Sequence, residues 1–461
     1  MTITVGTRSR AVLASLGVLA LALAAAVTPA HAADTTPPTP TQPFNGNRAC
    51  STEADQPTFV HARSGLTVEA VPGAVGATGS PRVTVTFQAW PVDDPTQITT
   101  ATHTNASPGW ESDATFPATA LTDGETYAWR ARTETVNAAS DWTAACFVTI
   151  DNTSPAAPAV ASPNYPQGGA WTPPGHPAEF TLDAGGDTDV TGFEFSWYRD
   201  LPVIGTSLGD YGVPQVSDPF TDTAHFVRAD ASGSTAHITL IPPYTGTVTL
   251  SVRSLDRALN VSAVSDYVFR IGSAAPTVTR DVESPEFGDE VTFTLHPAPG
   301  LQAISPTIGY ALDITGIENA PTEVTADADG TASLTLTLDG ASGVSLRVSG
   351  RSANGWISDS AYWSTSYDST PTVASDIYPE YDSGGGVGIT GSFTFAPTVK
   401  NVVSYTYAFS GEPEVTVPAD AGHTATVAWA PSAEGSYDLL VYATTESAAR
   451  TESAAYTFWV E

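Results

Sequence analysis

Acidic side chains that lie close together in the sequence are the first candidates for chemistry. Asp183, Asp187 and Asp189 fall in the segment LDAGGDTDV. Carboxylates at such intervals in a loop can converge on a hard cation, so the segment predicts a Ca²⁺ site, although no glutamate closes it as in an EF-hand loop. Asp327 and Asp329 form a second, shorter pair before a glycine. For both groups the alternative is turn chemistry, and an Asp-Gly pair between alternating strands is a common hairpin turn.

Tryptophans outside the predicted strands are candidates for stacking on sugar rings. Four of them lie in loops or near strand ends: Trp110, Trp171, Trp356 and Trp363. An exposed, flat indole can bind a sugar ring, so these residues are the predicted ligand-binding set. The alternative is that each tryptophan packs over the end of its own domain.

The sequence predicts no catalytic residue and favours a protein that is not an enzyme. Gly205 to Gly209, GTSLG, match the nucleophile-elbow pattern, but that pattern requires a helix after it. The following DYGVPQVSDPF cannot form one. A surface loop is the better interpretation. The histidines are scattered, without the spacing that would place two imidazoles on one metal.

The two cysteines, Cys50 and Cys146, predict a disulfide bond. In an exported chain two thiols usually pair, and closing a loop of this length would stabilise a domain by about 4–5 kcal/mol in the chain-entropy model. A free thiol or a metal-binding pair is the alternative, but no CxxC spacing supports it.

Residues 1–32 have the pattern of a signal peptide. Arg8 and Arg10 precede an apolar run, and Ala30-His31-Ala32 supplies a cleavage pattern that predicts a mature chain starting near Ala33. A membrane anchor is the alternative for this run. No later segment is long and apolar enough to cross a bilayer. The chain is therefore expected to be secreted or extracellular, with no membrane span in the mature protein.

The charge balance excludes nucleic acid as a partner. The chain has 49 acidic residues against 17 Lys and Arg, and Lys400 is the single lysine. A net charge of −32 repels phosphate backbones and anionic lipids. With 41% hydrophobic and 14% charged residues, the chain is too apolar to be disordered.

Short alternating segments predict an all-β protein. Segments of five to eight residues rich in Val, Thr, Tyr and Phe alternate apolar and polar positions, as in Arg82 to Trp90. Prolines and glycines cluster between them. Strands at this spacing in blocks of about 100 residues predict tandem immunoglobulin-like or fibronectin III-like β-sandwich domains in a row.

A strand-loop-strand motif recurs four times and indicates four domains. It occupies 247–271, 344–363, 436–460 and, more loosely, 126–150. Two further landmarks repeat. Tyr165 and Tyr378 each open a tyrosine-proline segment, and Ala-Asp-Ala turns place Asp230, Asp327 and Asp420 at similar intervals. We interpret the polar loop of the recurring motif as closing the fold rather than as a site.

Proline-rich segments then set the predicted boundaries. They divide the mature chain into a linker, 33–43, and four domains: 44–151, which contains the disulfide, 152–272, 273–369 and 370–461. Only the first linker is long enough to be a flexible arm, so the others are expected to hold neighbouring domains in a semi-rigid row.

The motif ending VRSLDRALNVSAVSDYVFRI, at 252–271, is similar to the ending of immunoglobulin-like repeats in large secreted proteins of actinobacteria. The first domain resembles the module that often precedes such repeats. In those families the modules stand beside LamG-like or DNRLRE-type domains, which implies surface adhesion or carbohydrate contact. The third repeat departs from the pattern, since SPEFGDE replaces the tyrosine-proline segment.

Three classes of function follow from these patterns. The first is a non-catalytic, monomeric repeat protein, secreted or at the cell surface, that acts as a spacer or adhesion array and contacts an extracellular protein or polysaccharide. The second is a carbohydrate- or cell-wall-binding protein that uses exposed loop tryptophans. The third is a secreted glycosidase with paired carboxylates across a cleft. No cofactor is expected apart from the Ca²⁺ considered above.

Overall fold

Strands form nearly all of the regular structure, which confirms the predicted all-β class. The computed structural model describes residues 36–73 and 81–461, so the predicted signal peptide lies outside the described residues. These residues contain a single α-helix, α1 (Pro299–Ile304), and three 3-10 turns, η1 (Ala118–Ala120), η2 (Asp210–Gly212) and η3 (Pro219–Thr221). The first strand begins at Thr41, so it includes the last three residues of the predicted linker.

Residues 41–150 form the first pair of sheets. One sheet has the order β2 (Arg48–Ala49), β1 (Thr41–Asn45), β4 (Leu66–Val71), β7 (Ser112–Phe116). The other has the order β3 (Thr58–Val60), β9 (Cys146–Ile150), β8 (Thr126–Glu134), β5 (Val83–Pro91), β6 (Thr99–Ala106). Phe87 and Trp129 lie between the sheets with no exposed surface. Cys50 is bonded to Cys146, which confirms the predicted disulfide.

The second and third pairs of sheets share one topology. The second pairs β10 (Ala159–Ala161), β11 (Ala178–Asp183) and β16 (Thr235–Leu240) with β15 (Phe226–Arg228), β12 (Val190–Ser196), β17 (Gly246–Asp256) and β18 (Ser265–Ile271). The third pairs β19 (Thr277–Arg280), β20 (Glu290–His296) and β23 (Ala332–Thr337) with β22 (Glu323–Thr325), β21 (Thr307–Thr315), β24 (Gly343–Ser352) and β25 (Ile357–Ser366).

The fourth pair extends the same plan by one edge strand. It packs β26 (Thr372–Ser375), β28 (Gly391–Ala396) and β31 (Ala425–Trp429) against β27 (Ser383–Gly384), β33 (Ala454–Val460), β32 (Gly435–Thr445), β29 (Val402–Phe409) and β30 (Val415–Pro418). Alternating burial along the strands directs one face of each sheet into the sandwich, as in β28, where Gly391, Phe393 and Phe395 are buried and the residues between them are half-buried. These are tandem β-sandwiches of the immunoglobulin-like or fibronectin III-like kind. We refer to them as domains 1 to 4.

All four domains close with the same hydrogen-bond pattern. In each, a hydroxyl at the end of the polar loop accepts a backbone N–H from the preceding strand and donates to the next carbonyl. The hydroxyls belong to Ser140, Ser262, Ser358 and Thr451. The loop therefore turns back onto its own strand in the same way four times. We call residues 256–262, 352–358 and 445–451 the closing loops of domains 2, 3 and 4.

The tyrosine landmarks of the sequence meet inside the domains. The Tyr267 hydroxyl donates to the carbonyl of Tyr165 at 2.9 Å, and the Tyr456 hydroxyl donates to that of Tyr378 at 2.7 Å. These hydrogen bonds connect β18 and β33, the last strands of domains 2 and 4, to the first segments of the same domains. Domain 3 lacks this bond because it lacks the tyrosine-proline segment, and Phe293 packs there against Trp363 instead, with ring centroids 4.7 Å apart.

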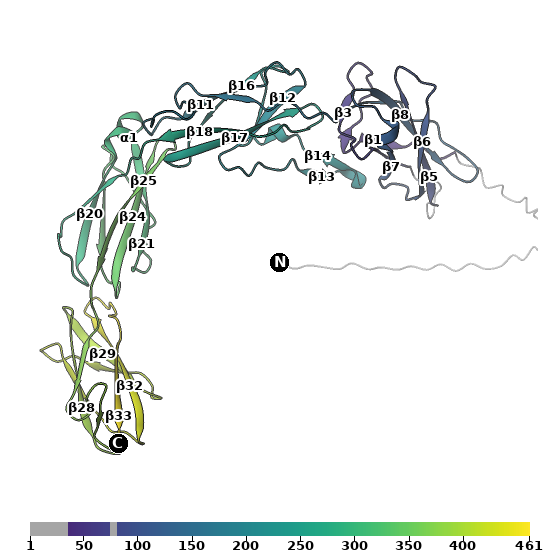
Figure 1. Ribbon diagram of the computed structural model, residues 1–461. Helices are drawn as coiled ribbons and strands as arrows, with labels where there is room; N and C mark the ends of the chain where they lie inside the picture. The colour runs from purple at the N-terminus through teal and green to yellow at the C-terminus, as the bar shows by residue number, and fades with distance from the viewer. Residues whose placement is uncertain (1–35, 74–80) are drawn as a thin grey trace, which may run out of the picture.

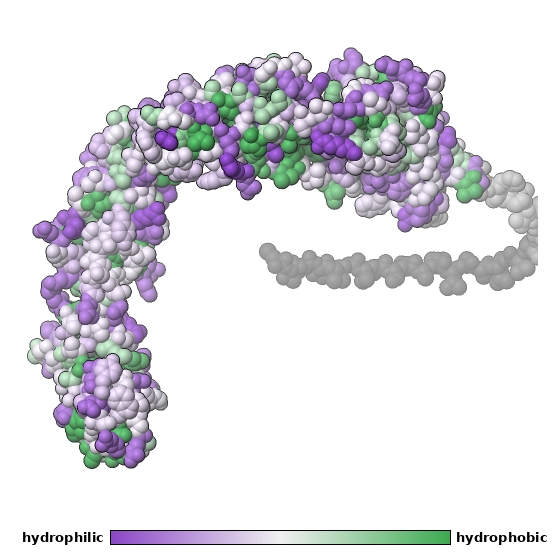
Figure 2. All heavy atoms as spheres, viewed as in Figure 1, coloured by the Kyte–Doolittle hydropathy of each residue, from purple (hydrophilic) through white to green (hydrophobic). Residues whose placement is uncertain are grey.

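The four domains form a bent row. Figure 1 shows domains 1 and 2 end to end, a bend beside α1, and domains 3 and 4 continuing in the new direction to the C-terminus. Figure 2 shows a surface of mixed hydropathy along the row, with hydrophilic residues gathered where domains 1 and 2 meet.

The joint between domains 2 and 3 is the apolar one. Trp356, in the closing loop of domain 3, is fully buried and belongs to the core cluster of domain 2, together with Leu301 of α1. The Asn354 side chain donates to the carbonyl of Gly175 at 2.8 Å. Domain 3 therefore completes the end of the domain 2 core.

A carboxylate strengthens the same joint. Asp359 accepts hydrogen bonds from the Ser273 hydroxyl at 2.5 Å, the Ala274 N–H at 2.7 Å and the Thr245 hydroxyl. Burial would raise the pKa of Asp359, but these donors outweigh it and hold the pKa below its usual value. The ionised carboxylate thus ties the end of domain 2 to domain 3.

The contacts described below between domains 3 and 4 are polar. The Glu452 N–H, just after the closing loop of domain 4, donates to the Ser369 hydroxyl at 2.9 Å. Lys400 pairs with Glu286 across the joint at 2.5 Å, and both side chains are exposed.

Candidate functional site

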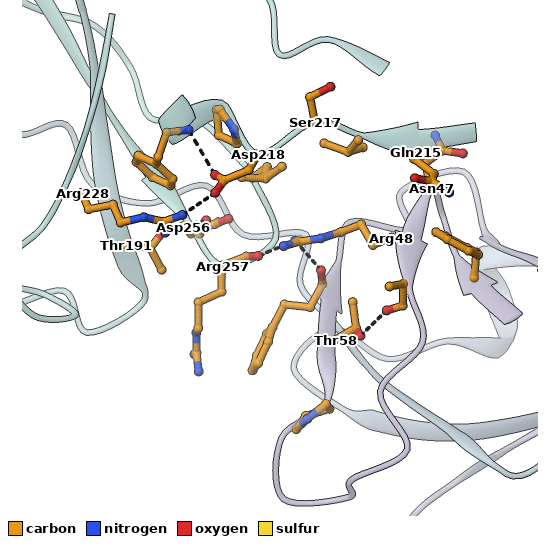
Figure 3. A pocket seen from close by; sticks show the side chains of 18 residues that line it. Asn47, Arg48, Thr58, Thr191, Gln215, Ser217, Asp218, Arg228, Asp256 and Arg257 are labelled. Carbon is orange, nitrogen blue, oxygen red and sulfur yellow. Dashed lines mark hydrogen bonds and ion pairs between the residues drawn. The ribbon is translucent and has the colours of Figure 1, made fainter. Parts of the chain in front are cut away.

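The joint between domains 1 and 2 combines a groove with buried charged groups. The groove has a volume of about 730 Å³ and is lined from both domains, with Phe44 and Arg48 on one side and Asp218, Arg228 and Arg257 on the other. Figure 3 shows Arg48 reaching from domain 1 to the backbone of Arg257 in domain 2. These are the features from which we build the candidate site.

Arg48 connects the two domains through carbonyl oxygens. Its Nη1 donates to the carbonyl of Phe59 at 2.8 Å and to that of Arg257 at 2.5 Å. Burial lowers the pKa of Arg48, while the charges of Asp256 and Asp218 act in the opposite direction. The guanidinium remains charged, because an arginine pKa starts far above neutrality.

The closing loop of domain 2 lies against domain 1 and the linker. Asn260 Nδ2 donates to the carbonyl of Asp151 at 2.9 Å, and Asn260 Oδ1 accepts from Arg63 at 3.4 Å. The Arg257 guanidinium lies 3.9 Å from the centroid of the Phe59 ring, a cation–π contact. The sequence-based interpretation of this loop as only a fold-closing element is therefore incomplete, because its outer side chains also form the interdomain contact.

Three carboxylates converge at the start of this loop. Asp151 follows β9, Asp189 precedes β12 and Asp256 ends β17. One oxygen from each lies within 4.8 Å of the other two. Within the described part of the chain, no other group of three or more His, Cys, Asp or Glu side chains brings its potential ligand atoms this close together. Asp256 is fully buried, Asp151 is 9% exposed and the Asp189 side chain is 28% exposed.

The three carboxylates differ in their partners. Asp256 accepts from the Asn260 N–H at 2.7 Å and from Asn260 Nδ2 at 2.9 Å, while Asp189 pairs with Arg257 Nε at 2.5 Å. Asp151 Oδ1 accepts a long bond from the Thr153 N–H, 3.3 Å, and no described residue donates to Asp151 Oδ2. Asp151 therefore holds one buried oxygen without a hydrogen-bond partner.

The environment of the cluster disfavours negative charge. Burial raises the pKa of Asp151 to about 7, and the charge of Asp256 and the adjacent Asp189 carboxyl add to the shift. Burial also raises the pKa of Asp256, although the Asn260 donors oppose it. A positive charge among these oxygens would relieve the repulsion, so the arrangement is suited to a cation or a proton.

The three aspartates of the predicted calcium loop, Asp183, Asp187 and Asp189, do not act together in the structure. Asp183 Oδ1 accepts from the Gly185 N–H at 2.8 Å, and Asp187 Oδ1 accepts from the Asp189 N–H at 3.2 Å, so both carboxylates support their own turn. Asp189 joins Asp151 and Asp256. Calcium binding by the predicted set of three stays a prediction.

The pair Asp327 and Asp329 forms a turn. The Asp327 N–H donates to the Thr331 carbonyl at 2.7 Å, and Asp329 Oδ1 accepts from the Thr331 hydroxyl at 2.7 Å. The Asp420 N–H makes the same backbone bond to Thr424 in domain 4. Turn chemistry therefore accounts for this pair.

The four candidate tryptophans do not form one surface. Trp110 is 64% exposed and lies beside Gly212 of η2, whereas Trp171 is 59% exposed and adjoins Thr172, which bridges the end of β18. Trp363 is half-buried. Trp356 is fully buried because domain 2 covers it, so its ring cannot stack on a sugar in this structure.

The GTSLG segment lies on a hairpin. Gly205–Gly209 contain β13 (Thr206–Leu208), which pairs with β14 (Pro214–Val216) through η2 rather than leading into an α-helix. The Val216 N–H donates to the Asn47 carbonyl at 2.9 Å, so this hairpin is also part of the joint with domain 1.

Sequence reasoning missed Asp151 and Asp256 as site residues. Asp256 belongs to the recurring motif, and Asp151 opens a proline linker, so the sequence pattern predicts structural roles for both. The usable signal was positional. Asp151 lies directly after the last strand of domain 1, and Asp256 lies in the closing loop of domain 2, so end-to-end contact of these two domains brings the two aspartates together.

Comparisons with known proteins assign neither a family nor an activity to this chain. No protein-family model matches the sequence, and no curated protein matches it. Among solved structures, the chain is similar to the chicken CNTN1 FN1-FN3 domains, with 14% identity over 67% of this chain and 100% of that one, and a TM-score of 0.25.

Two bacterial structures are also similar. A Ca²⁺-stabilized adhesin with which an Antarctic bacterium binds ice has 14% identity over 92% of this chain and 100% of that one, with a TM-score of 0.22. The fibronectin(III)-like modules of Clostridium thermocellum CbhA have 15% identity over 40% of this chain and 94% of theirs, with a TM-score of 0.17. At these values the likeness carries no argument, and the fold class rests on the sheets described above.

Proposed function

We propose that the chain is a non-catalytic extracellular spacer and adhesion array, in which braced sandwich domains hold a binding surface away from its point of attachment. The observation that carries this proposal is that each of domains 2, 3 and 4 contacts the domain or linker before it through its closing loop or the residue directly after that loop. The donors of these hydrogen bonds are Asn260, Asn354 and Glu452. Contacts of this kind restrict bending at a joint, as a spacer requires.

The remaining features support the same proposal. The disulfide suits an oxidising, extracellular setting. No helix in the described part of the chain has the length and apolar character of a membrane span. We propose that the chain is secreted through its N-terminal leader, works as a monomer, and contacts a protein or polysaccharide through loops that differ among the domains.

Negative-stain electron microscopy of the mature chain, residues 33–461, tests the spacer role. We expect class averages that repeat one bent four-domain outline, with the sharpest bend between domains 2 and 3. Particles whose bend angles vary continuously at every joint would refute the braced array. Size-exclusion chromatography with light scattering on the same sample tests the monomer.

A carbohydrate- or cell-wall-binding role is the second candidate, and the exposure of Trp110 and Trp171 favours it. A glycan and cell-wall array with the mature chain tests it. Retention that falls in Trp110→Ala or Trp171→Ala supports this role, and retention of no ligand by the unaltered chain refutes it. Because the two tryptophans lie in different domains, the two variants report separately.

A further inference from the structure

From the buried Asp151, Asp189 and Asp256 carboxylates we infer a Ca²⁺ site that joins domain 1 to domain 2. Domain 1 supplies Asp151 at the end of its last strand, and its N–H donates to the Val60 carbonyl of the same domain at 2.9 Å. Domain 2 supplies the other two ligands. The inference concerns the joint alone and holds whatever the chain binds.

The unpartnered oxygen of Asp151 is the observation that points to a ligand. Asp151 is nine-tenths buried, and within the described residues its Oδ2 has no donor. Leaving a buried carboxylate oxygen without a partner is costly, so such a group usually holds a proton or a metal ion. Its carboxylate lies within 4.8 Å of both other carboxylates, so a single ion can reach all three.

The positive charges around the three carboxylates do not balance their negative charges, so a cation can bind there. Arg257 neutralises Asp189 through one oxygen, while Asn260, which is neutral, supplies the donors to Asp256. Arg48 lies near enough to attract Asp256, but it donates its hydrogen bonds to carbonyl oxygens. Arg63 likewise donates to Asn152 and Asn260. Among the described residues, no arginine donates a hydrogen bond to Asp151 or Asp256, so negative charge remains uncompensated.

The ligand chemistry favours Ca²⁺ over other metal ions. All three groups offer hard carboxylate oxygens, and neither histidine nor cysteine takes part. An ion with Ca²⁺–O distances of about 2.3–2.6 Å can bridge oxygens up to about 5 Å apart, which covers the separation seen here. Mg²⁺ needs shorter bonds of about 2.0–2.1 Å in a strict octahedron, which a joint between two domains is less suited to supply.

Calcium titration of the metal-free mature chain tests this site, with Asp151→Asn as the main variant and Asp183→Asn as its control. Asp183 belongs to the same domain 2 loop as Asp189 but supports only its own turn. Isothermal titration calorimetry should give one Ca²⁺ per chain, an affinity at least tenfold lower in Asp151→Asn, and no change in Asp183→Asn. Differential scanning calorimetry without Ca²⁺ should show that Asp151→Asn is folded and no less stable than the unaltered chain, because it loses a buried charge.

Several outcomes would overturn the assignment. Absence of Ca²⁺ binding at millimolar concentration would mean that the carboxylates share a proton instead. Loss of binding in Asp183→Asn but not in Asp151→Asn would assign calcium to the loop Asp183, Asp187 and Asp189. Equal affinity for Mg²⁺ would refute the selectivity. The spacer role is tested separately, by the microscopy described above. A negative result there would not change the result expected from these titrations.

Discussion

Replacing Trp356 by alanine should loosen the joint between domains 2 and 3 and leave the other joints intact. The indole is fully buried within the core cluster of domain 2, although its backbone belongs to domain 3. A buried aromatic side chain removes roughly 150–250 Å² from water, which at about 25 cal/mol per Å² corresponds to roughly 4–6 kcal/mol. Tryptophan-to-alanine substitutions in cores cost about 3–5 kcal/mol.

The lower end of that range applies here. Trp356 Nε1 has no hydrogen-bond partner among the described residues, so the substitution also removes a buried unsatisfied donor. A loss of about 3 kcal/mol would lower the unfolding midpoint of a unit of about 200 residues by roughly 6–12 °C.

Differential scanning calorimetry together with small-angle X-ray scattering measures both consequences. We expect Trp356→Ala to lower the transition shared by domains 2 and 3 and to broaden the distribution of interatomic distances. Trp356→Phe is the matched control, since it keeps an aromatic ring without the unpaired N–H and should stay close to the unaltered chain. Trp171→Ala, at an exposed position, should have little effect. An unchanged midpoint and an unchanged distance distribution in Trp356→Ala would refute the claim that this side chain holds the joint.

Three further predictions concern other parts of the chain. Burial, followed by the charge of Glu111, raises the pKa of Glu69 from 4.5 to about 7. The contribution of this group to the stability of domain 1 is therefore full below pH 4.5 and is lost progressively, by about 3 kcal/mol in all, as the pH rises to about 7. Chemical denaturation from pH 4 to 8 should show that loss in the unfolding free energy of the unaltered chain, and a weaker pH dependence in Glu69→Gln. The same pH dependence in both proteins would contradict the assignment. Replacing Cys50 and Cys146 by serine should lower the unfolding free energy of domain 1 by about 4–5 kcal/mol and leave the other transitions in calorimetry unchanged. Lys400→Ala should not shift any midpoint, because its ion pair with Glu286 is exposed, and a clear shift would mean that this pair braces the joint.

The fold was predictable from the sequence because its signals are local. The alternating strands, the recurring motif and the Ala-Asp-Ala turns each depend on residues that are close in sequence, and the structure gives them the same hydrogen bonds in several domains. The disulfide followed from having only two cysteines in the chain.

The candidate site was not predictable in the same way, because domain contacts create it. Asp151, Asp189 and Asp256 come from three separate segments that meet only when domain 2 docks on domain 1. Trp356 follows the same principle, since its own loop would leave it exposed and the neighbouring domain buries it. A motif indicates how one domain closes, but it does not state which of its outer side chains the next domain will cover.

Small-angle X-ray scattering of the mature chain at several concentrations tests the central claim most directly. The account predicts a single bent row of four sandwiches, so the scattering should fit one arrangement with the contour of Figure 1 and should not change with concentration. Scattering that requires a broad ensemble of independently moving domains would contradict it.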